Sequence, residues 1–176
     1  MKGCGYFIWQ IETIRALYQP VELARLLKQA GTGWVSWKIA DGIKPANQIG
    51  GNDKILIEYM QALEAVGIVN GGWAYVYPTN PGPTGALISE RVQKFQLNLE
   101  TFGPVMLDVE GEWKKMGLNK QIDLLLYSID VNLKYPIGFC SYRFPELHAA
   151  LNFNRFVTND KVKFVSPQVY WMGQHN

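Results

Sequence analysis

The sequence predicts an α/β fold, namely a (β/α) barrel of the TIM type in a partial or reduced form. Apolar runs of strand length alternate with helix-like segments along all 176 residues, which is typical of a parallel sheet covered by helices. No Gly-x-Gly-x-x-Gly follows the first strand and no segment has the P-loop pattern, so nucleotide-binding folds lack their signature. Polar and aromatic residues gather where the strands end, the edge that carries the active site in barrels. These residues are Gln10, Asp41, Tyr77, Glu110, Arg143 and Tyr170.

Six runs have the length and the apolar, aromatic content of strands. In chain order, the predicted strands are 5–11, 34–40, 72–77, 105–110, 137–142 and 162–171. Pro167 lies inside the last run. Because proline cannot donate to a sheet ladder, this strand is expected at an edge or with a bulge.

Between the strands, apolar residues recur at helical spacing. Pro20 and Gly31 bracket the first helix, which is the usual asymmetry of helix ends. The turn-rich segment 78–85 is predicted as a loop before the third helix. In chain order, the predicted helices are 20–30, 54–66, 86–102 and 120–133, and a further helix begins at Pro145.

The length predicts a single domain spanning residues 1–176. A complete eight-stranded barrel typically has about 250 residues. The chain therefore fits either a reduced barrel or a barrel that lacks its last elements. An unclosed parallel sheet leaves ladder groups unpaired, which favours truncation or a covering partner.

The composition argues against several classes of protein. Lys and Arg total 17 against 15 Asp and Glu, with no basic cluster, so no nucleic-acid partner is expected. No apolar run reaches the roughly 18 residues of a membrane span, and the N-terminal segment is too short for a signal peptide. We therefore expect no membrane partner and synthesis in the cytoplasm, with later release or virion association left open. Two Cys and two His indicate neither a disulfide framework nor a usual zinc site, and no cofactor or metal is expected.

The strongest chemical signal is the segment PVMLDVEGEW. Asp108 and Glu110 stand two residues apart on a predicted strand, so they point to one face. Such a pair can divide acid and base roles, because each charge raises the proton affinity of the other, and glycoside hydrolysis uses two carboxyl groups in this way. The alternative is a pair of solvated acids at a strand end. Glu112 has the same parity but follows Gly111, so it is expected in the loop.

PVMLDVEGEW, together with GGWAYVYP on the preceding strand, resembles the family 25 glycoside hydrolases, the lysozyme-type muramidases. The segment KIADG resembles the Lys-x-x-Glu-Gly that ends the family's second strand, with Asp41 in place of Glu. Trp9 and Gln10 resemble the Trp-Gln after its first strand. The resemblance implies a hydrolase of a cell-wall-type glycan. It makes Glu110 the general acid and Asp108 the second carboxylate, acting on the reaction centre or orienting an N-acetyl group.

The sequence departs from the family at two acidic positions. Gly5 or a neighbour stands where the family has an Asp near its first strand. On the sixth strand, Gln168 and Tyr170 stand where a further Asp is expected. These departures leave open a divergent enzyme, a barrel enzyme that acts on something other than a glycan, and a non-catalytic carbohydrate-binding or structural barrel, such as a virion or cell-surface component.

Several side chains at strand ends are candidates for contacting a glycan. Arg143 could bind a carboxylate or pair with Glu146, and Gln168 could bond a ligand or satisfy backbone groups. For Tyr77, both sugar stacking and core packing stay open. The candidate substrate-binding residues are Asp41, Tyr77, Arg143, Gln168 and Tyr170.

Three further residues on the predicted strands are interpreted as structural. Lys38, if it faces the barrel, needs a partner, and we expect Asp108 or Asp41. Trp73 and Tyr75 share one strand face with Tyr77 that either lines the barrel or faces the helices, and core packing is favoured for Trp73 and Tyr75.

Overall fold

The structure, a computed structural model, describes residues 3–129 and 136–168 as a curled sheet with helices on its outer side. Six parallel strands follow one another in the order β1-β2-β4-β5-β6-β7, and the short β3 pairs antiparallel with β2. The strands are β1 (Cys4–Ile8), β2 (Thr32–Asp41), β3 (Lys44–Pro45), β4 (Val69–Tyr75), β5 (Phe102–Asp108), β6 (Ile137–Tyr142) and β7 (Val162–Gln168). The predicted partial (β/α) barrel is confirmed as an open half-barrel.

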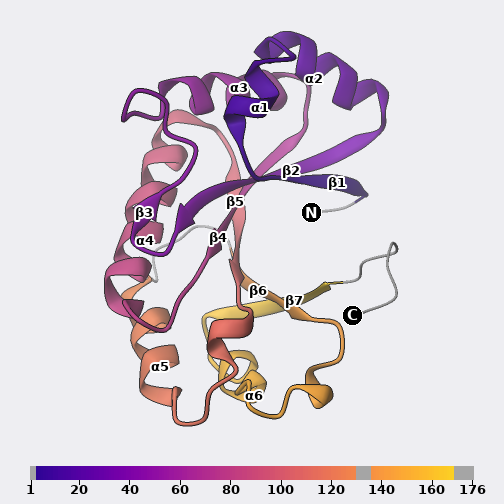
Figure 1. Cartoon of the computed structure of the whole chain (residues 1–176). Coiled ribbons are helices and arrows are strands. Elements are labelled where there is room, and N and C mark those ends of the chain that lie inside the picture. Colours follow the sequence, from indigo (N-terminus) through magenta and orange to yellow (C-terminus); the bar gives the residue numbers. More distant parts are fainter. Residues whose placement is uncertain (1–2, 130–135, 169–176) are drawn as a thin grey trace.

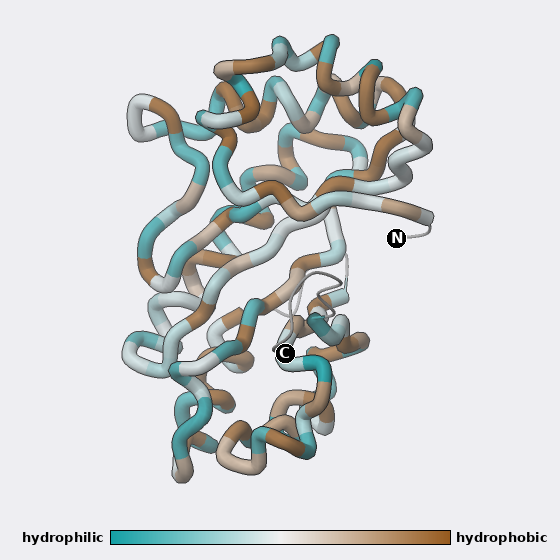
Figure 2. Tube along the Cα trace, turned by 45° about the vertical axis from the view of Figure 1, so that its right-hand side comes forward, coloured by the Kyte–Doolittle hydropathy of each residue, from teal (hydrophilic) through white to brown (hydrophobic). Residues whose placement is uncertain are grey.

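The helices surround the sheet from α2 at the top of Figure 1, through α4 on the left, to α6 at the bottom. They are α1 (Ile11–Arg15), α2 (Pro20–Gln29), α3 (Lys54–Ala65), α4 (Pro81–Asn98), α5 (Asn119–Ser128) and α6 (Phe153–Val157), with 3-10 turns η1 (Gly111–Trp113) and η2 (Pro145–Leu147). Apolar and polar residues alternate along the uppermost helices in Figure 2, as expected for helices with one buried face. Within the two described ranges, no helix has the length and apolar character needed to cross a bilayer.

The two faces of the sheet have different roles. Val105 and Leu107 on β5, and Val109 directly after it, point to the helices and belong to the main hydrophobic core. Met106 and Asp108 alternate with them and point to the concave side, as the period of two predicts. The outer face therefore holds the fold together, and the inner face is left for other contacts.

The main error in the predicted elements concerns the start of α4. The predicted loop 78–85 contains Pro81 and Pro83, and both lie in the first turn of this helix. Proline is tolerated there because the first N–H groups of a helix have no intrahelical partner. At its other end α4 stops at Asn98, and Gly103 and Pro104 belong to β5.

Three smaller differences concern the remaining elements. Ile11, predicted at the end of a strand, begins α1 and is fully buried. The connection after β2 contains the two-residue β3. The helix expected from Pro145 is the 3-10 turn η2, with α6 following later. The last residues of the predicted helix 120–133 and of the predicted strand 162–171 lie outside the described residues.

The sheet has two unlike edges among its described strands. β7 lies at one edge, as Pro167 predicted, and it also carries Lys163. β1 lies at the other edge and contains no charged residue and no proline. Its Tyr6 and Phe7 are about half exposed, at 51% and 49%.

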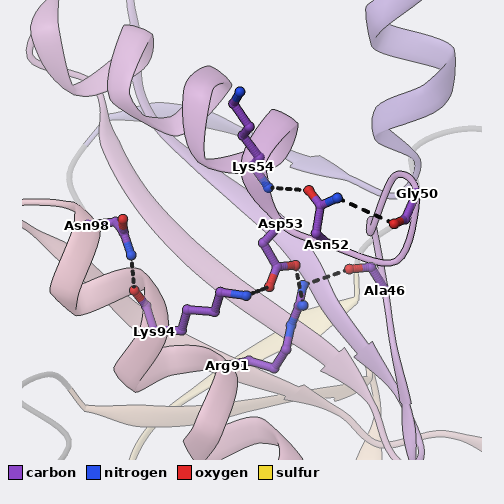
Figure 3. Close-up of polar contacts among 8 residues, drawn as sticks. All are labelled: Ala46, Gly50, Asn52, Asp53, Lys54, Arg91, Lys94 and Asn98. Atoms are coloured by element: carbon purple, nitrogen blue, oxygen red, sulfur yellow. Dashed lines mark hydrogen bonds and ion pairs between the residues drawn. The ribbon is translucent and has the colours of Figure 1, made fainter.

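A buried ion cluster fixes the connection between β2 and α3 (Figure 3). The carboxylate of Asp53, 1% exposed, pairs with the guanidinium of Arg91, which is 2% exposed. Lys94 Nζ lies 2.6 Å from the other carboxylate oxygen of Asp53. Arg91 also donates to the carbonyl of Ala46 at 2.8 Å. The cluster therefore ties α4 to the loop that leads from the end of β2.

We expect Asp53→Asn to lower the free energy of unfolding by about 3–5 kcal/mol, because it leaves the buried Arg91 without its counter-ion. Urea denaturation monitored by circular dichroism measures the loss. The matched control is Lys94→Gln, which removes the partly exposed member of the cluster and should cost less than about 1 kcal/mol. Equal losses in the two variants would contradict this ranking.

Candidate active site

The register of the parallel strands places four side chains in one row across the inner face. Asp41 on β2 pairs with Tyr75 on β4, and Tyr75 pairs with Asp108 on β5. Asp108 in turn pairs with Cys140 on β6. Because paired residues of a parallel sheet point to the same side, this row brings two acids from distant segments to one edge.

A second row lies one pleat further toward the amino ends of the strands. It consists of Lys38, Trp73, Met106 and Gly138. The ring of Phe164 covers Gly138 so closely that a Cβ there would lie 2.3 Å from it. This row forms the floor beneath the acids.

Gln168 joins the two predicted catalytic acids. Its side-chain Nε2 donates to Asp108 Oδ1 at 3.0 Å and to Glu110 Oε1 at 2.6 Å. Since both oxygens bond the same nitrogen, the two carboxyl groups lie side by side. The structure thus brings Gln168, which the sequence singled out separately, to the carboxylate pair.

The environment of Asp108 favours its neutral form. Burial and the charge of Glu110 raise the pKa of Asp108 to about 7, although Lys38 and the hydrogen bond from Gln168 oppose the shift. The Asp108–Glu110 pair therefore retains a proton close to neutral pH. Burial and the charge of Asp108 also raise the pKa of the Cys140 thiol, to about 12, so this thiol is not a nucleophile at neutral pH.

Asp41 has the opposite electrostatic environment. Lys38 Nζ lies 2.7 Å from its Oδ2, and the Tyr77 hydroxyl donates to its Oδ1 at 2.9 Å. Although burial opposes ionisation, these two contacts hold the pKa of Asp41 below its ordinary value. Burial and Asp41 raise the pKa of Tyr77 to about 12, so the phenol keeps its proton and donates. The predicted pairing of Lys38 with Asp41 is confirmed.

An aromatic box surrounds the Lys38 ammonium. Its Nζ lies 5.6 Å from the ring centre of Trp9, 5.1 Å from that of Trp73 and 5.9 Å from that of Tyr75. Trp73 and Tyr75 were expected in the core, and that expectation is wrong, because both stand on the inner face. Their shared parity with Tyr77, a strand-end residue, was the signal that could have placed them there.

Glu112 is a member of the site that sequence reasoning assigned only to a loop. It lies in the 3-10 turn η1, and its Oε2 accepts a 2.9 Å hydrogen bond from the Tyr75 hydroxyl. Burial and the hydrogen bond to Glu112 raise the pKa of Tyr75, so the phenol remains the donor.

Two cavities occupy the region of the strand ends. One, of about 650 Å³, is lined by Lys38, Asp41 and Tyr77 together with the loop after β2. The other, of about 380 Å³, is lined by Asp108 and Gln168 among mainly apolar side chains. Partly apolar cavities with a few convergent polar groups are typical of small-ligand and glycan sites.

Two candidates do not join this group. Arg143 is exposed, and its guanidinium lies over the Phe144 ring at 4.7 Å from the ring centre. Its neighbour Tyr142 has the same parity as the inward-facing Cys140 and contacts the Lys114 ammonium, which lies 3.6 Å from its ring centre. Tyr170 lies outside the described residues. In the described part of the chain, no three His, Cys, Asp or Glu side chains are grouped to hold a metal ion.

Comparison with known proteins yields a likeness in fold. No family model and no curated protein matches the sequence. Among solved structures, the chain is similar to the catalytic domain of endolysin ply40 from bacteriophage P40 of Listeria monocytogenes, with a TM-score of 0.56 and 17% identity. The match covers 80% of this chain and 63% of that chain, so the present chain spans under two thirds of its length. At this identity the similarity shows that the two chains share a fold.

We expect Asp108→Asn to stabilise the protein at pH 8 and to leave its stability unchanged near pH 3.5. Because the folded-state pKa of about 7 lies above the ordinary aspartate value of 3.8, the folded state loses stability as the pH rises through this interval. Asparagine removes that loss, which is on the order of 1–3 kcal/mol, and its amide still accepts from Gln168. Urea denaturation at both pH values measures the difference.

The matched control for this effect is Asp123→Asn on α5. Hydrogen bonds from Arg155 lower the pKa of Asp123, so its removal should cost stability at neutral pH and cost nothing in acid. A loss of stability in Asp108→Asn at pH 8 would show that Asp108 is ionised without penalty.

Proposed function

We propose that this chain hydrolyses glycosidic bonds in a cell-wall-type glycan, in the manner of a peptidoglycan muramidase. The observation that carries the proposal is the Asp108–Glu110 pair, which shares Gln168 and retains a proton near neutral pH. Glycoside hydrolysis requires a carboxyl group that is still protonated at the working pH, together with a second carboxylate near the reacting sugar.

Glu110 is the general acid in this proposal, and Asp108 is the second carboxylate. Asp108 is the last residue of β5, and Glu110, two residues beyond it, stands nearer to the mouth. The proton that burial and the charge of Glu110 keep on Asp108 passes from Asp108 to Glu110, and Glu110 gives it to the leaving oxygen. Asp108 then acquires negative charge next to the oxocarbenium-like centre or the N-acetyl group and stabilises it.

The surroundings of the pair support a glycan as the ligand. Tyr77 and Asp41 line the larger cavity, where a phenol and a carboxylate can contact a hydroxylated ring. Arg143 and Tyr170 stay predictions as glycan contacts. The fold shared with the catalytic domain of a phage endolysin supports peptidoglycan as the glycan, and release or virion association as the setting in which the chain would meet it.

We expect Glu110→Gln to lower the rate of peptidoglycan hydrolysis by about 10²–10⁴-fold, because it removes the proton donor. Dye release from labelled peptidoglycan and from chitin-type oligomers measures the rate. The control is Glu100→Gln, an exposed acid just before the start of β5, at the opposite end from Glu110, which should hydrolyse at the wild-type rate.

Binding separates the proposed enzyme from the alternative of a non-catalytic sugar-binding barrel. If the wild-type protein is a glycosidase, the Glu110→Gln variant should fail to cleave the glycan but should still bind it saturably. Saturable binding by a wild-type protein that cleaves no glycan would establish the binding barrel and contradict the proposal. An absence of both would favour a barrel that acts on a different class of molecule.

A further inference from the structure

Glu112 is a half-buried carboxylate beside the proposed acid pair that has no role in the function proposed above. Its Oε2 accepts the hydrogen bond from Tyr75, whose register partners are Asp41 on one side and Asp108 on the other. Within the described chain, its second oxygen accepts no hydrogen bond. Glu112 therefore offers a carboxylate oxygen to the site without breaking an existing contact.

The turn that carries Glu112 is rigidly held. The next residue, Trp113, is 1% exposed, and its indole donates to the carbonyl of Val76 at 2.8 Å. The backbone N–H of Trp113 donates to the backbone carbonyl of Glu110 at 3.0 Å, and that of Lys114 donates to the backbone carbonyl of Gly111 at 3.1 Å. The position of Glu112 relative to Glu110 is thus set by the backbone and by a buried anchor.

The other acids of the site are poorly suited to activate a water molecule. Asp108 and Glu110 lie side by side, because both accept hydrogen bonds from the side-chain nitrogen of Gln168, and the pair retains a proton. When a water attacks in a single displacement, the acid and the base stand about 6.5–9.5 Å apart to leave room for it. Asp41 forms an ion pair with Lys38 and also accepts from Tyr77. Glu112 has one neutral donor, Tyr75, and lies in the turn η1, two residues after Glu110.

We propose that Glu112 is the general base of the site, and this rests on the proposed function. The water oxygen bonds to the anomeric carbon of the glycan while the bond from that carbon to the leaving oxygen breaks. Glu112 takes a proton from the water, and Glu110 gives its proton to the leaving oxygen. Tyr75 is a positioning residue, because its hydroxyl orients the Glu112 carboxylate without touching the reacting atoms.

The test is hydrolysis of peptidoglycan by Glu112→Gln with and without sodium azide. Azide attacks without losing a proton, so it can replace the water in a variant that lacks only the base. We expect kcat to fall about 10²–10⁴-fold, KM to stay within a few-fold of wild type, and azide to restore turnover with formation of a glycosyl azide. Tyr75→Phe, which keeps the carboxylate, should lose less activity.

Two controls separate catalysis from folding. Circular dichroism and the thermal midpoint verify that Glu112→Gln is folded. Glu146→Gln replaces an exposed acid of the neighbouring turn η2 and should match wild type with and without azide.

The outcomes are distinct for the two proposals. Wild-type activity in Glu112→Gln, or a loss that azide does not restore, overturns the role of Glu112 and leaves the glycosidase proposal standing. A wild-type protein that hydrolyses no glycan overturns both.

Discussion

The parallel register of β2, β4, β5 and β6 is the constraint on which the site depends. It sets Asp41, Tyr75, Asp108 and Cys140 in one row, although these residues come from separate βα units. The core on the outer face fixes this register, because a slip by one residue would turn Val105 and Leu107 away from the helices. The packing that stabilises the sheet therefore also aligns its acids.

The charges at the mouth are balanced by specific contacts, since the site has few cations close to its acids. Lys38 compensates the charge of Asp41. The side-chain amide of Gln168 donates to Asp108, and the phenol of Tyr75 donates to Glu112. Burial of Asp108 raises its pKa most, and the repulsion from Glu110, which a neutral donor such as Gln168 leaves largely intact, adds to the effect, so the pair keeps a proton. A lysine or arginine in place of Gln168 would drive both acids to ionise. The neutral side chain of Gln168 thus allows burial to keep the pair protonated.

The sequence predicts those features that depend on local pattern. The strand 137–142 matches β6 residue for residue, and period-two spacing places Asp108 on the inner face. The start of α4 escaped prediction because prolines and glycines that form turns can also occupy a first helical turn. The contact between Gln168 and Glu110 spans 58 residues and depends on the arrangement of β5, β6 and β7. No local pattern encodes it.

The unlike edges of the sheet have a consequence for how the protein behaves in concentrated solution. Lys163 and Pro167 make β7 a poor template for an added strand, because one brings charge and the other lacks an N–H group. β1 offers an uncharged ladder flanked by the half-exposed rings of Tyr6 and Phe7. Strand addition is therefore favoured at β1 over β7, and a charge introduced on β1 would oppose it without touching the carboxylates of the mouth.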